Sequence, residues 1–391
     1  MSALTPVTLE HAKACPFEAR AWVDDKLVAE SSKTLRMERP GATHSLCFPV
    51  SDVKGELPSP SDELLSPAPS GYVAFNTDCA RVRVSLVDGL ANEPERERTV
   101  KRFPTWGDAA NLIDMLNVRP NGDGGYVSVT RDNAANRHRG VVEGSQMLAQ
   151  AIVAAGRHSP GRRVVSASMV FMRAANTVEP LQIELEELSK GRNMTTLAPH
   201  VRQAGKLCAS GIMLLDVTAP DVIRHAAAAP ETKGPYDSEP YDMSVTSRDV
   251  RFVDGAYTGD PEAPVGPPVL DAWVRFREVP DDPALHAGLL AQFTGHLSIG
   301  AALRCHAGVG ESQAHVTLST GINAINISFH RDVRADEWML YHHHSTAAGD
   351  GMTHSECRVH NDDGELLASF TVDAMVRAFS GGTTGDFRSS M

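Results

Sequence analysis

One pattern occurs twice in this chain: a segment with helical spacing of apolar residues, followed by several long segments that read as β-strands. The first helical segment covers residues 142–155, and Gly156 is expected to end it. The second covers residues 286–303, where apolar residues recur every fourth position. Strand-like segments follow the first helix at 164–173, 181–188, 195–203 and 207–215, and the second at 314–318, 322–330 and in three further pieces between 337 and 379. A helix followed by antiparallel strands, present twice, predicts an α+β protein built from two similar units.

The length of 391 residues allows two or three domains, and we divide the chain accordingly. Strand-like pieces separated by turn residues predict a small, mostly β N-terminal domain. The expected parts are an N-terminal domain at 1–100, a first repeat at 108–220, a linker region at 221–268, a second repeat at 269–380 and a flexible tail at 381–391.

Composition narrows the range of partners. The formal net charge of −12 disfavours non-specific binding to nucleic acid. No apolar run approaches the length needed to span a membrane, and the N-terminus lacks the pattern of a signal peptide. The six cysteines are dispersed without a CxxC pair, so we expect reduced thiols and a cytoplasmic protein.

Five blocks in the repeats carry a resemblance to a known family. They are residues 141–146, 149–152, 327–331, 336–341 and 363–369, and the last three follow one another in the family's order and spacing. Over roughly residues 108–380 the chain resembles the acyl-CoA thioesterase II family. Residues 1–95 more weakly resemble a small β-rich family of unknown function, through residues 28–32 and 47–53.

The resemblance implies a tandem, or double, hot-dog fold, in which each repeat wraps an antiparallel sheet around a long helix. It also implies hydrolysis of an acyl-CoA, or another acyl thioester, to a carboxylic acid and a free thiol by direct attack of water. Such an enzyme acts in fatty acid metabolism and needs no cofactor, because CoA is part of the substrate. Hot-dog units usually assemble further, so we expect a homo-oligomer.

The residues that perform this chemistry in the family are missing from the matching positions. The family uses an Asp on the second helix, a Thr or Ser on the next strand and a Gln on the last strand to hold the attacking water. An ungapped match puts these positions at Gly295, Ile322 and Val372. None of these three side chains can hold or activate a water molecule.

Polar residues next to these positions are the first candidates, because a one-residue bulge would bring some of them into register. His296 has a side chain that titrates near neutrality and is a candidate general base. Asn323, or Asn326, could orient the water or the thioester carbonyl. Asp373 could accept a proton from His296 or supply the carboxylate itself.

The start of the first helix supplies a second set of candidates. In some hot-dog thioesterases a catalytic carboxylate lies where Glu143 lies here, so Glu143 or His138 could activate water. The N–H group of Gly144, next to Ser145, could polarise the thioester carbonyl, because the first N–H groups of a helix have no partner within it. Arg139 could contact the phosphates of CoA. The alternative is that Glu143 only complements the helix dipole and that His138 and Arg139 are ordinary loop and surface residues.

Two other types of site are not expected. The run His342-His343-His344 lies in a strand-like segment, where alternate side chains point to opposite faces, so we expect no metal site there. The chain has no GxSxG motif and therefore no sign of an α/β-hydrolase.

Two other functions remain open at this point. The first is a hot-dog hydratase or dehydratase that acts on an enoyl thioester, with His296 or His138 as the proton carrier. The second is a protein that binds acyl-CoA without catalysis, which the missing Asp, Thr and Gln favour.

Overall fold

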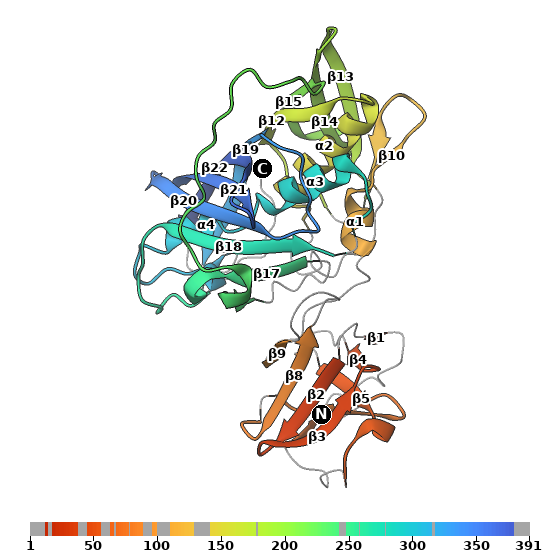
Figure 1. The fold of residues 1–391 in the computed structure, drawn as a ribbon, viewed down its shortest axis with the longest axis vertical. Coiled ribbons are helices and arrows are strands. Elements are labelled where there is room, and N and C mark those ends of the chain that lie inside the picture. Colours follow the sequence, from red (N-terminus) through yellow and green to blue (C-terminus); the bar gives the residue numbers. More distant parts are fainter. Residues whose placement is uncertain are drawn as a thin grey trace. The chain divides into compact units, whose positions relative to one another are not determined.

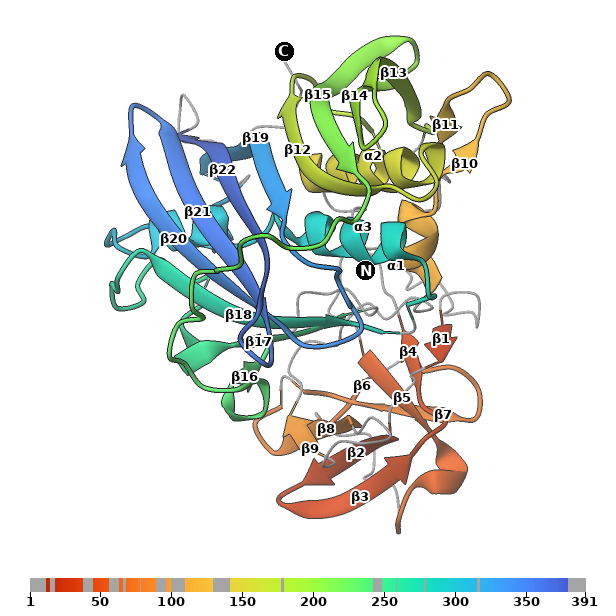
Figure 2. The same cartoon turned by 45° about the horizontal axis from the view of Figure 1, so that its top comes forward.

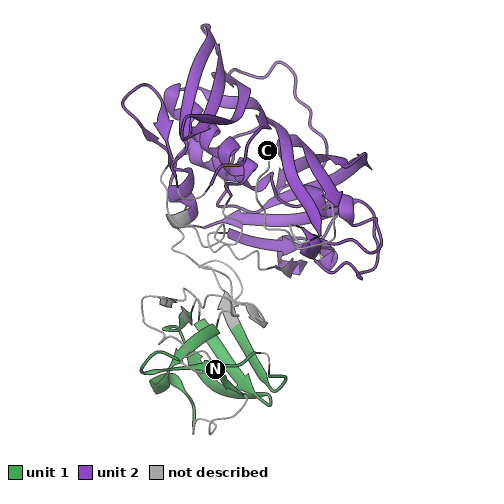
Figure 3. Cartoon of the chain, turned by 180° about the vertical axis from the view of Figure 1, so that it is seen from behind, with its two compact units in different colours: residues 1–107, 242–246 green, residues 108–241, 247–391 purple. Residues whose placement is uncertain are grey.

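The computed structural model divides the chain into two compact units, coloured separately in Figure 3. Unit 1 comprises residues 1–107 with 242–246, and unit 2 comprises residues 108–241 with 247–391. The expected tail, 381–391, lies outside the part of the chain that the structure describes. The described residues are 12–14, 18–37, 45–55, 63–65, 68–77, 79–88, 96–99, 110–128, 141–176, 179–241, 248–257, 259–277, 279–314 and 317–378.

Unit 1 is a small β domain made of two sheets, with strand orders β1-β4-β5-β7-β6 and β3-β2-β8-β9. The expected hairpin forms between β2 and β3, with positive φ angles at Asp24 and Asp25. The first sheet contains β1 (Ala12–Ala14), β4 (Leu35–Met37), β5 (Ser45–Pro49), β6 (Leu64–Leu65) and β7 (Tyr72–Phe75), with a short 3-10 helix at Val50–Asp52. The second contains β2 (Glu18–Val23), β3 (Lys26–Ser31), β8 (Val82–Asp88) and β9 (Arg96–Thr99).

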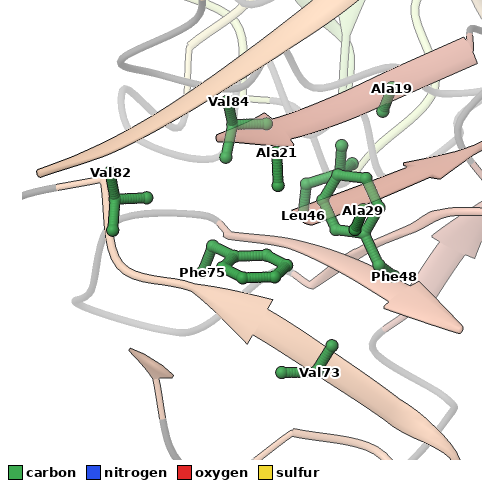
Figure 4. Packing of buried hydrophobic residues seen from close by; sticks show 9 residues of the cluster. All are labelled: Ala19, Ala21, Ala29, Leu46, Phe48, Val73, Phe75, Val82 and Val84. Atoms are coloured by element: carbon green, nitrogen blue, oxygen red, sulfur yellow. The ribbon is translucent and has the colours of Figure 1, made fainter. Parts of the chain in front are cut away.

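The core of unit 1 combines small residues with two large rings (Figure 4). Ala21 and Ala29, from adjacent strands, leave space that Phe48 and Phe75 fill from the other sheet. The two phenylalanine rings meet edge to face, with centroids 5.5 Å apart. This small core is separate from the interior of unit 2.

Unit 2 contains one sheet of 13 strands, in the order β10-β11-β13-β14-β15-β12-β19-β22-β21-β20-β18-β17-β16. The two repeats join where β12 pairs with β19, in antiparallel register from Ser166↔Ser328 to Val170↔Ala324. The strands of the first half are β10 (Arg119–Pro120), β11 (Tyr126–Val127), β12 (Arg163–Phe171), β13 (Gln182–Lys190), β14 (Met194–Gln203) and β15 (Lys206–Asp216). Those of the second half are β16 (Glu239–Pro240), β17 (Arg248–Phe252), β18 (Val269–Phe276), β19 (Leu318–Phe329), β20 (Met339–Gly349), β21 (Met352–Asn361) and β22 (Leu366–Ala378).

The central helices of the two repeats lie side by side, with strands of both repeats curved around them (Figures 1 and 2). A side chain at Gly288 would press on Val153, and one at Gly156 would press on Ala284. These two glycines therefore allow the helices to approach closely. The helices are α1 (Ala110–Leu116), α2 (Gly144–His158), α3 (Pro283–Phe293) and α4 (Ser298–Leu303), with 3-10 turns at Pro235–Asp237, Val253–Gly255 and Glu311–Gln313.

The structure confirms the double hot-dog arrangement and corrects three details of the sequence prediction. The first helix continues through Gly156 to His158, because Gly156 serves helix packing and not helix termination. The predicted helix at 286–303 is two helices, α3 and α4, with a break at 294–297 where Leu297 has a left-handed φ of 70°. Residues 315 and 316 of the predicted strand at 314–318 lie outside the described residues, and β19 begins at Leu318. The segment expected as a linker, 221–268, contains β16 and β17.

Among the described residues, no helix is long and apolar enough to cross a membrane.

The pairing of β12 with β15 depends on a glycine at position 211. A β-carbon there would meet the backbone carbonyl oxygen of Ser168, which cannot move because β12 is paired on both sides. We expect Gly211→Ala to lower the free energy of unfolding by about 1–3 kcal/mol, measured by urea denaturation. Gly349→Ala is the matched control, since nothing lies within 4 Å of its added carbon. Equal stability of the two variants would contradict the steric argument.

Candidate active site

Two of the predicted catalytic residues, from different repeats, come together in the structure. Glu143 immediately precedes α2, and His296 lies in the break between α3 and α4. The Glu143 Oε2 and His296 Nε2 atoms are 3.6 Å apart, and the two side chains are 28% and 15% exposed. Since they reach each other across the packed ends of α2 and α3, the close approach of the helices creates this pair.

Two further polar residues complete the cluster, and the sequence analysis missed both. Arg248, on β17, donates from Nη1 to Gln292 Oε1 at 3.0 Å and contacts His296 Nε2 at 3.2 Å. Arg248 is 6% exposed and Gln292 is 4% exposed. Burial lowers the pKa of the Arg248 guanidinium to about 10, although the charge of Glu143 acts in the opposite direction. Gln292 lies one helical turn before His296. That spacing was the only feature of the sequence that could have pointed to Gln292 as part of the site.

The contact with Arg248 defines the protonation of His296. A guanidinium can only donate, so Nε2 must accept and the ring proton is assigned to Nδ1. The lone pair on His296 Nε2, with which the imidazole would act as a general base, therefore already accepts a hydrogen bond from Arg248. Glu143 is left as the group in this cluster best able to take a proton from water.

The break in the second helix also brings Gly295 against the first helix. A β-carbon at Gly295 would collide with the Ser145 side chain and would lie 3.4 Å from Ile322 Cδ1. Ser145 therefore occupies the space into which an aspartate at 295 would project. Its Oγ is buried and has no hydrogen-bond partner among the residues that the structure describes.

Asn323 is the extra residue of a β-bulge in β19. Ile322 pairs with Ala374 and Ala324 pairs with Asp373, so Asn323 has no partner on β22. Its Oδ1 is buried and has no hydrogen-bond donor. The bulge that the sequence analysis considered is thus present next to Ile322.

Gly144 opens α2 in contact with an aromatic ring. Phe171 packs so closely against it that an added β-carbon would lie 2.9 Å from the ring. The position therefore requires glycine. The Gln146 N–H donates to the carbonyl oxygen of Glu143, whereas the N–H groups of Gly144 and Ser145 precede this first hydrogen bond of the helix, which makes them suitable donors to a thioester oxygen.

Of Asp373, His138 and Arg139, only Asp373 is described, and it is not part of this cluster. Asp373 does not face His296: it lies on the opposite face of the sheet from the buried Val372 and Ala374 and bonds His354 Nδ1 at 2.6 Å. The proposed relay from His296 to Asp373 is therefore wrong. His138 and Arg139 lie outside the described residues.

The three consecutive histidines alternate across β20, as strand geometry requires. His343 is fully buried, and burial lowers its pKa to about 3. His342, on the other face, bonds Asp271 at 2.6 Å.

Fold and site together define a double hot-dog protein with a polar cluster between its two repeats. The family model for the acyl-CoA thioesterase N-terminal domain matches residues 133–215, and that for the acyl-CoA thioesterase C-terminal domain matches residues 223–376. The chain belongs to the acyl-CoA thioesterase II-like family. Residues 1–107 of unit 1 lie outside both matches.

Individual relatives agree with this assignment. The chain is 25% identical to mouse acyl-coenzyme A thioesterase 8 over 264 residues, which are 60% of this chain and 79% of that protein. Acyl-CoA thioesterase II TesB2 of Mycobacterium marinum is 26% identical with a TM-score of 0.57, and the match covers 69% of this chain and 98% of that one. A tesB protein of Mycobacterium avium subspecies paratuberculosis is similar in fold, with 21% identity, a TM-score of 0.58 and coverage of 69% and 100%.

The contact between Gly295 and Ser145 can be tested by a double-mutant cycle. Gly295→Ala should destabilise the protein by about 1–3 kcal/mol, because the added methyl group meets the Ser145 side chain. Ser145→Gly removes the obstacle, so the double variant should recover most of the loss in thermal unfolding. Strictly additive effects would show that the two positions are not in contact.

Proposed function

We propose that this chain hydrolyses an acyl-CoA thioester at the cluster of Glu143, His296, Arg248 and Gln292. The observation that supports this site is the convergence of Glu143 and His296 from the two repeats, beside the unpartnered oxygen of Ser145. The family to which the chain belongs supports the reaction type. No cofactor is required in this proposal, since CoA is part of the substrate.

In the proposed mechanism, Glu143 removes a proton from water, and the resulting hydroxide attacks the thioester carbonyl carbon. The negative charge that forms on the carbonyl oxygen is held by the N–H groups at the start of α2 and by the Ser145 hydroxyl. The carbon–sulfur bond then breaks, and the protonated Glu143 returns its proton to the thiolate of CoA. The products are a carboxylic acid and free CoA, with no covalent intermediate.

The test is release of free thiol from short, medium and long acyl-CoAs. We expect Glu143→Gln to lower kcat by about 100-fold or more, because the amide cannot take the proton from water. Glu187→Gln, an exposed residue on β13, is the matched control and should retain full activity.

Two results would contradict this proposal in different ways. Full activity of Glu143→Gln would exclude Glu143 as the base. Binding of acyl-CoA without thiol release from any chain length would favour the non-catalytic alternative, and water addition to an enoyl-CoA would favour a hydratase.

The proposal extends to the setting of the protein. A cytoplasmic location is consistent with the five described cysteines, which are all free thiols. A role in fatty acid metabolism follows from the proposed hydrolysis of an acyl-CoA. We also propose a homo-oligomer. It is supported by exposed apolar residues on neighbouring strands of the outer sheet face, Val170 at 51% and Ile212 at 50% exposure.

The oligomer can be tested on that face. Ile212→Glu should shift the protein to a smaller species in light scattering, because a charge would be buried at the contact between copies. Lys206→Glu changes the charge of an exposed residue on the same strand and should leave the mass unchanged. A single monomeric species in the unmodified protein would overturn the proposal.

A further inference from the structure

Arg248 differs from Arg275, a buried arginine on the neighbouring strand β18. Arg275 forms an ion pair with Asp249 at 3.0 Å. Arg248 is 6% exposed, yet no carboxylate oxygen of the described residues lies within the 4.0 Å of an ion pair. Buried charges in proteins are normally paired, so a buried arginine without a direct countercharge needs an explanation.

The contacts that Arg248 makes are with neutral groups. Its Nη1 contacts the amide oxygen of Gln292 and the imidazole of His296, and its guanidinium lies 4.9 Å from the centre of the Phe293 ring. Its Nε is buried and has no hydrogen-bond acceptor in the described structure. These contacts hold the Arg248 side chain in place. Its Nε–H group still has no acceptor, and its guanidinium forms no ion pair with a described residue.

We propose that Arg248 binds a second carboxylate on the acyl group, so that the substrates are acyl thioesters of short dicarboxylic acids. This inference rests on the proposed hydrolytic function and adds the class of acyl group to it. A carboxylate matches the fork of N–H groups on a guanidinium better than any neutral group does. A purely hydrocarbon acyl group would leave the buried cation and its free N–H without a partner.

The geometry limits the length of the acyl group. Arg248 contacts His296 at 3.2 Å, and His296 lies 3.6 Å from the carboxylate of Glu143, where water would be activated. The Arg248 guanidinium and the Glu143 carboxylate are thus at most about 7 Å apart, a distance that roughly two three-bond units of extended chain can span. Acyl groups of about four to six carbons fit this distance, and long chains place the carboxylate elsewhere.

Charge in the cluster supports the same conclusion. Burial lowers the pKa of Arg248 to about 10 even though Glu143 favours its charged form, so the nearby carboxylate does not offset the loss of water. Glu143 and the acyl carboxylate would flank the guanidinium and the imidazole, which separates the two negative charges from each other. An anionic acyl group therefore supplies the missing countercharge without meeting Glu143 directly.

The test compares matched pairs of thioesters: succinyl-, glutaryl- and adipyl-CoA against butyryl-, valeryl- and hexanoyl-CoA. We expect kcat/KM of the unmodified protein to favour the dicarboxylic member of at least one pair by roughly 30- to 1000-fold. Arg248→Met keeps the apolar stem and should abolish that preference, while Arg248→Lys should retain part of it. Arg202→Met, which changes a partly exposed arginine on β14, is the control and should keep the preference. Thermal unfolding of each variant checks that it is folded.

A binding measurement separates this inference from the proposed function. The non-hydrolysable thioethers S-(3-carboxypropyl)-CoA and S-butyl-CoA are compared by calorimetry, so no turnover is needed. Tighter binding of the carboxypropyl compound that is lost in Arg248→Met supports the inference even if no thioester is hydrolysed. Equal binding of the two compounds, or a preference that survives in Arg248→Met, overturns it, whatever the hydrolytic activity.

Discussion

The close packing of α2 against α3 is the constraint on which the rest of unit 2 depends. Gly156 and Gly288 remove the side chains that would hold the helices apart, and Ala284 and Val153 fill the contact from the other side. Helices that meet through glycine cannot slide past each other without new collisions. The start of α2 is therefore fixed beside the end of α3. That register, more than any single hydrogen bond, sets Glu143 next to His296.

The polar cluster is costly to bury, and this cost is informative. Ser145 Oγ, Arg248 Nε and Asn323 Oδ1 are all buried atoms without hydrogen-bond partners. Each such atom costs the folded protein about 1–3 kcal/mol relative to water. Most other buried residues of the two repeats are apolar. Apolar side chains could therefore have filled this space as well. Buried polar atoms without a protein partner are expected where a ligand or water completes the hydrogen bonding.

Periodicity in the sequence was sufficient to predict two similar α+β units, because the helix and strand patterns extend over long segments, and the family resemblance added the hot-dog arrangement. It could not predict the break at 294–297, since Leu297 continues the apolar spacing while its backbone is left-handed. Glu143 and His296 were identified as candidates from residue type and from position relative to the family, but only the helix packing brings them together. Arg248 was missed because it lies in a segment that resembles a linker and becomes part of the site only through the pairing of β17 with β18. The prediction for Asp373 was wrong for a local reason. Adjacent residues of a strand point to opposite faces of the sheet, so Asp373 points away from the face that carries Val372 and Ala374.

The replacement of the family's aspartate by Gly295 is a change in packing as much as in chemistry. Because Ser145 fills the space beside Gly295, an aspartate there cannot be accommodated while α2 keeps its position. A carboxylate for this junction must therefore come from another element, and Glu143 at the start of α2 is the nearest one that the structure describes. Its location has a further consequence. At position 143 the carboxylate belongs to the first repeat and lies at the N-terminus of α2. Arg248 of the second repeat lies on the other side of His296 from Glu143. The positive and negative charges therefore flank the imidazole, an arrangement that a single aspartate on the second helix would not create.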